Sequence, residues 1–118
     1  VKKLTETISL NRLTSRVTIH HAVVGQLEVD VESNADIIPI SDIPGCDVLI
    51  LDCEGAELHI LDGYKGNPEY IIVETHGFLG SSREDVSELI NSQGYAIVET
   101  NALDESKGAY VLTAIPDE

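Results

Sequence analysis

The chain has 118 residues, of which 42% are hydrophobic, and a formal net charge of −14. This length predicts a single domain over residues 1–118, and the apolar content is that of a folded protein and not of a disordered acidic tail. The 21 acidic side chains outnumber the 7 basic ones. This balance argues against nucleic acid and anionic membranes as partners, because binding either requires Lys and Arg to neutralise phosphates.

No apolar run is long enough to cross a bilayer, which takes about 20 residues, and we expect no signal peptide because polar residues follow Lys2 and Lys3. Cys46 and Cys53 flank one extended run, so they are too far apart to form a disulfide. Without a disulfide framework or a CxxC zinc motif, a reducing, cytoplasmic location is expected. The high negative charge would also suit a cytoplasm of high salt.

Residues 1–13 carry a helical apolar stripe, although the chain contains no methionine and opens within this pattern, which indicates a fragment. Residues 16–24, rich in β-branched side chains, predict a strand, and the alternation in 28–33 predicts a second, short one. Residues 35–45 contain two prolines, which favours a sheet edge or a loop.

Residues 46–52 form a continuous apolar run, typical of a strand buried on both faces, and 69–76 form another. A helix is expected over 54–61, stopped by Gly63, and a second one over 82–92 behind a capping box at Ser81 and Ser82. Residues 95–100 and 108–115 predict an antiparallel hairpin. The whole pattern predicts an α/β fold with a mostly parallel sheet closed by this hairpin.

Acidic side chains stand where the two buried strands end. Asp52 and Glu54 follow the first of these strands, and Glu74 and His76 end the second. Ligands of open parallel sheets bind beyond the carboxyl ends of the strands, so these four residues are the candidate site. Like charges this close favour a compensating cation, a shared proton or the positive end of a helix.

Simpler interpretations compete with a site. At the start of a helix, the negative charge of Glu54 would interact favourably with the helix dipole. Glu57, one turn further along, is expected to be solvated. His20 and His21 end the first visible strand without a metal-ligand partner at helical spacing, so a metal role is not expected for them.

The stretch DVLILDCEGAELHILDG, followed by PEYIIVETH, closely resembles the FkbM family of S-adenosylmethionine-dependent methyltransferases. SLNRLTSRVTIHHAVVG and IIPISDIPGCD are similar to the segments that precede this motif in the family, so the resemblance covers most of residues 4–115. It implies a Rossmann-like class I methyltransferase sheet with the strand order 3-2-1-4-5-7-6. Residues 17–24 would be the third strand, 47–52 the fourth and 69–75 the fifth, with the hairpin as sixth and seventh. The first two strands and the Gly-rich cofactor loop would be missing.

The resemblance also implies roles for particular residues. Asp52 and Glu54 would lie near the transferred methyl group and the acceptor, and Glu74 and His76 would line the acceptor side. His21 and Ala22, with Asp52, would contact the cofactor. Ile50 stands where many members of the family carry a lysine.

The leading interpretation is therefore O-methylation of a sugar or small-molecule hydroxyl, with S-adenosylmethionine as co-substrate. Asp52 is the first candidate to take the acceptor's proton and Glu74 the second. Cofactor binding by this chain alone is expected to be weak or absent.

Two alternatives stay open. In the first, Asp52, Glu54, Glu74 and His76 of a different enzyme hold Mg²⁺ or Mn²⁺. In the second, the chain is a non-catalytic interaction fragment. Missing central strands would expose sheet edges, which predicts a homo-oligomer or a rearranged sheet with the third strand beside the fourth.

Overall fold

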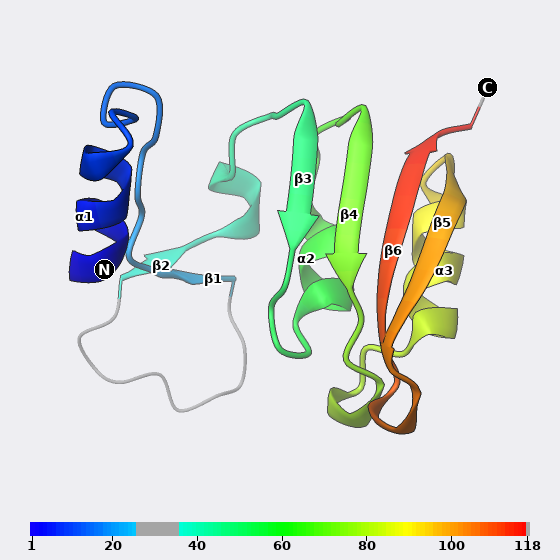
Figure 1. Cartoon of the computed structure of the whole chain (residues 1–118). Coiled ribbons are helices and arrows are strands. Elements are labelled where there is room, and N and C mark those ends of the chain that lie inside the picture. Colours follow the sequence, from blue (N-terminus) through cyan, green and yellow to red (C-terminus); the bar gives the residue numbers. More distant parts are fainter. Residues whose placement is uncertain (26–35, 118) are drawn as a thin grey trace.

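A computed structural model describes residues 1–25 and 36–117 (Figure 1). The short strand expected over 28–33 lies outside the described residues. In the described part, helices and strands alternate along most of the chain. The helices are α1 (Lys2–Leu10), α2 (Glu57–Gly63) and α3 (Arg83–Ser92), and the strands are β1 (Val23–Val24), β2 (Ile37–Ile38), β3 (Val48–Leu51), β4 (Tyr70–Glu74), β5 (Tyr95–Asp104) and β6 (Ala109–Pro116), with 3-10 turns η1 (Ile40–Asp42), η2 (Gly77–Leu79) and η3 (Glu105–Lys107).

The main sheet has four strands in the order β3-β4-β6-β5. β3 and β4 run parallel, and β6 pairs antiparallel with both β4 and β5. The predicted α/β class and the terminal hairpin are therefore confirmed. The prediction of a mostly parallel sheet is wrong, because only one of the three strand pairings in the described sheet, β3 with β4, is parallel. The order also equals the one that the family resemblance implies for a fourth, fifth, seventh and sixth strand, although four strands alone do not identify a methyltransferase.

The core lies between one face of this sheet and the helices α2 and α3, which Figure 1 shows on the same side of the sheet. Leu49 and Leu51 of β3 point into this core and are buried, whereas Val48 and Ile50 are 46% and 68% exposed. The prediction that β3 is buried on both faces is therefore wrong. It is also wrong for β4, where Tyr70 is 47% exposed. No helix or strand among the described residues covers the other face of β3.

The expected strand over 16–24 is also wrong for most of its length, because only Val23 and Val24 pair. They lie parallel to β2 in a separate two-stranded sheet, held by backbone bonds such as Val23 N to Asp36 O at 2.8 Å. The segment is therefore neither a third strand of the main sheet nor a neighbour of β3. Residues 16–18 are exposed, and β-branched residues form a strand only where a partner strand is available.

The remaining expectations differ mainly at element ends. α1 ends at Leu10 instead of residue 13, and α2 begins at Glu57 instead of Glu54. α3 begins as predicted, with the Ser82 side chain accepting a hydrogen bond from the N–H of Asp85. Cys46 and Cys53 are both free thiols, as their spacing predicted. None of the helices in the described ranges has the length and apolar character needed to span a membrane.

Candidate functional site

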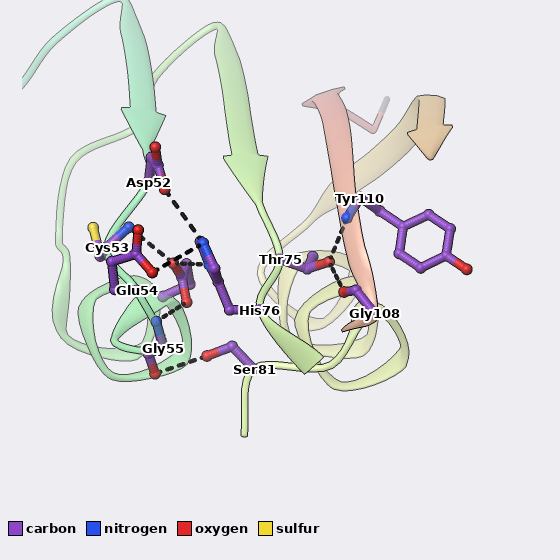
Figure 2. Close-up of polar contacts among 10 residues, drawn as sticks. Asp52, Cys53, Glu54, Gly55, Thr75, His76, Ser81, Gly108 and Tyr110 are labelled. Carbon is purple, nitrogen blue, oxygen red and sulfur yellow. Dashed lines mark hydrogen bonds and ion pairs between the residues drawn. The ribbon is translucent and has the colours of Figure 1, made fainter. Parts of the chain in front are cut away.

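The carboxyl ends of β3 and β4 lie side by side. Leu51 pairs with Val73 in the parallel register, so Asp52 and Glu74, the next residue of each chain segment, follow at the same edge. His76 lies two residues beyond Glu74, and its Nε2 is 3.4 Å from Oδ1 of Asp52 and 3.7 Å from Oε2 of Glu54 (Figure 2). The structure thus brings together all four residues that the sequence marked as the candidate site.

A fifth residue, Glu57, supports this cluster from the protein interior. Its side chain is fully buried and accepts hydrogen bonds from the backbone N–H of Cys53 at 2.9 Å and of Gly55 at 3.1 Å. Its Oε1 is also 2.8 Å from Nδ1 of His76. The prediction that Glu57 is solvated is wrong, because residues 53–56 form a turn and not a first helical turn. As the first residue of α2, Glu57 also lies at the positive end of that helix.

The turn before α2 depends on two left-handed residues, Glu54 with φ of 50° and Gly55 with φ of 105°. A Cβ on Gly55 would lie 2.9 Å from Cβ of Leu79, so only glycine lets the loop after β4 approach this closely. Ser81 of that loop donates a hydrogen bond from Oγ to the Gly55 carbonyl at 2.8 Å. The two loops that carry the site are therefore fastened to each other.

His76 is held by its backbone as well as by its ring. Its backbone N–H donates to the Ser81 carbonyl at 2.9 Å, and the residue is 4% exposed. A carboxylate oxygen accepts hydrogen bonds, so Nδ1 of His76 is the nitrogen that donates to Glu57. With its hydrogen on Nδ1, the imidazole presents the lone pair of Nε2 to the carboxylates of Asp52 and Glu54. That arrangement is repulsive unless a proton or another cation lies between them.

The carboxyl group of Glu74 interacts with that of Asp52. Burial raises the pKa of Glu74, the negative charge of Asp52 raises it further, and the nearby His76 works in the opposite direction. Asp52 and Glu54 have side chains that are 58% and 75% exposed, so they are accessible from solvent. By contrast, burial and the charge of Glu57 raise the pKa of the Cys53 thiol, which makes Cys53 a poor nucleophile.

An apolar cavity of about 520 Å³ lies at the free edge of β3, next to this cluster. Its wall includes Ile50, Leu51 and Cys53 from the end of β3, together with Val24 and His20 from the segment around β1. His21 and Ala22, which the resemblance assigns to cofactor contact, are not among the residues that line it; His21 is exposed. The β-branched pattern of 16–24 predicted a strand, but it did not indicate which side chains of the segment face the cavity.

In comparisons with known proteins, no family model matches the chain and no curated protein matches its sequence. The assignment to the FkbM family therefore stays an expectation that rests on the quoted motifs.

Proposed function

We propose that the chain is part of an S-adenosylmethionine-dependent O-methyltransferase of the FkbM type that acts on a sugar or small-molecule hydroxyl. The observation that carries the proposal is the meeting of Asp52 and Glu74 at the carboxyl ends of adjacent parallel strands, beside an apolar cavity. This is the edge at which open α/β sheets bind their ligands. The strand order β3-β4-β6-β5 supports the finer proposal of a class I methyltransferase sheet.

The chemistry uses the negative charge of this edge. The acceptor oxygen attacks the methyl carbon of the sulfonium, the new O–CH₃ bond forms, and the electron pair of the broken S–CH₃ bond stays on sulfur. The hydroxyl proton passes to the carboxylate pair of Asp52 and Glu74. Holding oxygen, carbon and sulfur in line supplies much of the rate, and proton removal contributes about 10²–10⁴-fold. Carboxylates at the site also attract the cationic sulfonium.

The cavity supplies an apolar wall of the right kind for the flat, uncharged part of the cofactor, since ligand pockets of this volume are mostly apolar with few polar groups. Two free cysteines, Cys46 and Cys53, support a proposed location in a reducing compartment such as the cytoplasm.

The test is a titration of the ¹⁵N-labelled chain with S-adenosylhomocysteine, followed by NMR. Weak, millimolar binding is expected, with amide shifts confined to residues 23–25 and 52–56, which surround the cavity and the carboxylate pair. Ile50→Glu places a charge in the cavity wall at little structural expense, because Ile50 is 68% exposed, and should abolish the shifts.

Val98→Glu is the matched control, since Val98 is a β5 residue that is 56% exposed and does not line the cavity. It should bind as the unchanged chain does. Shifts that lie outside these residues, or shifts that Ile50→Glu leaves unaltered, would refute the proposal.

A further inference from the structure

We propose that Asp52, Glu54 and His76 form a binding site for a divalent transition-metal ion, with Glu57 as the residue that orients the imidazole. The inference goes beyond methyl transfer and does not require it, because the metal alone is the ligand. One oxygen of each carboxylate and one ring nitrogen of His76 all lie within 4.8 Å of one another.

The distances between the donor atoms fit a common ion. With metal–ligand bonds of about 2.1 Å and angles between about 90° and 109°, donor atoms lie roughly 3.0–3.4 Å apart. Nε2 of His76 is 3.4 Å from Oδ1 of Asp52 and 3.7 Å from Oε2 of Glu54. The exposed Glu54 side chain closes the remaining gap by a small rotation.

The burial and orientation of His76 also point to a metal ligand. More than nine-tenths of this residue is buried, and its Nε2 points at the two carboxylates from 3.4 and 3.7 Å, distances that are long for a hydrogen bond (Figure 2). Its other nitrogen is fixed by a buried carboxylate that two backbone N–H groups hold in place. A histidine that donates one N–H to a carboxylate and turns the other nitrogen outward is the usual arrangement of a metal-ligating imidazole.

Charge and ligand type select the class of ion. Glu57, Glu74 and the two ligand carboxylates place four acidic groups around one imidazole, so a dipositive ion relieves repulsion that a proton relieves only in part. Carboxylate oxygens suit Mg²⁺, Ca²⁺ and Mn²⁺, while imidazole suits transition metals. Mn²⁺ satisfies both preferences and is the probe of choice. Three protein ligands leave positions open for water or an acceptor oxygen.

The experiment titrates the full chain with Mn²⁺ alone and follows the electron paramagnetic resonance signal of the free ion. One site per chain is expected, and spin-echo modulation should show a nitrogen bound directly to the metal. Asp52→Asn with Glu54→Gln should weaken binding at least tenfold, and Glu57→Gln should weaken it about 10–100-fold. His76→Gln should remove the nitrogen signal.

The controls carry the same substitutions at exposed positions of the helices that pack against the sheet. His59→Gln on α2 and Glu88→Gln on α3 should leave both affinity and nitrogen signal unchanged. The Asp52 and Glu54 side chains are largely exposed, so that double variant is expected to stay folded even if the His76 variant does not. Weak binding without a nitrogen signal, or binding that the double variant retains in full, would overturn the proposal. Because S-adenosylhomocysteine is absent, failure here leaves the methyltransferase test unaffected.

Discussion

Of the side chains in the site, Glu57 contributes most to holding the surrounding structure in place. It has no exposed surface, yet it satisfies two backbone N–H groups and one ring nitrogen that would otherwise lack partners. In doing so it fixes the turn that carries Asp52 and Glu54 and the ring of His76 in one arrangement. Packing, charge and hydrogen bonding at this one residue therefore determine the geometry of the whole cluster.

Glu57→Ala should lower the free energy of unfolding by about 3 kcal/mol or more, because each buried donor left unpaired costs about 1–3 kcal/mol. Chemical denaturation measures the loss. Glu88→Ala, on the exposed side of α3, is the control and should change stability by no more than about 0.5 kcal/mol. A loss of that small size for Glu57→Ala would show that the three hydrogen bonds do not hold the turn.

The sequence predicted part of this residue-scale arrangement and missed the rest. Two apolar runs, 46–52 and 69–76, predict two neighbouring parallel strands. The proximity of Asp52 and Glu74 follows from the geometry of such strands. Glu57 was missed because its burial depends on where the helix begins. Glu54 and Gly55 take left-handed conformations, and no apolar periodicity signals them. Glu57 is flanked by apolar residues in the chain and follows two other acidic residues, Asp52 and Glu54. The sequence therefore did not indicate that its role differs from theirs.

At the scale of elements, the long hairpin and α3 were predictable because local signals mark both ends of each. The segment over 16–24 was not, because its β-branched composition describes a preference that needs a partner strand, and only Val23 and Val24 find one. The end of α2 is joined to the segment before β3 by Tyr64, whose hydroxyl donates to the Pro44 carbonyl at 3.2 Å and lies 3.2 Å from Sγ of Cys46.

Tyr64 predicts a loss of stability at alkaline pH. Burial, followed by the contact with Cys46, raises the pKa of its phenol to about 12, against about 10 for a tyrosine in an unfolded chain. The folded state therefore favours the neutral phenol. The resulting stabilisation is complete below about pH 10 and is lost as the pH rises towards 12, with a total on the order of 2 kcal/mol.

Denaturation of the chain and of Tyr64→Phe across this pH range measures the effect, and the stability difference between them should shrink as the pH rises. Tyr70→Phe serves as control because Tyr70 is 47% exposed on β4. An equal pH dependence for the chain and Tyr64→Phe would contradict the assignment.

At the scale of the molecule, the main feature is a sheet that has helices on one face only among the residues that the structure describes. Val48 and Tyr70 are register partners on the uncovered face, and Ile50 lies on the same face of β3. Their exposed fractions of 46%, 47% and 68% leave a continuous apolar surface next to the free edge of β3. Such surfaces and edges favour association with another chain.

We therefore predict that the chain self-associates, and that salt strengthens the association because it screens the repulsion between chains of net charge −14. Light scattering over a range of concentrations and salt should show the increase in mass. Val48→Lys with Tyr70→Lys should shift the equilibrium towards monomer, while Leu10→Lys on the exposed side of α1 should not. A monodisperse monomer under all these conditions would disprove the prediction.

The left-handed backbone of Glu54 has one last consequence. Residues other than glycine and asparagine disfavour the left-handed conformation. Glu54 therefore stores strain on the order of 1 kcal/mol. A glycine there would relax the turn and remove one of the charges that face His76. Folding stability and the chemistry of the cluster thus favour different residues at position 54. Homologues that lack this chemistry are expected to carry glycine at this position.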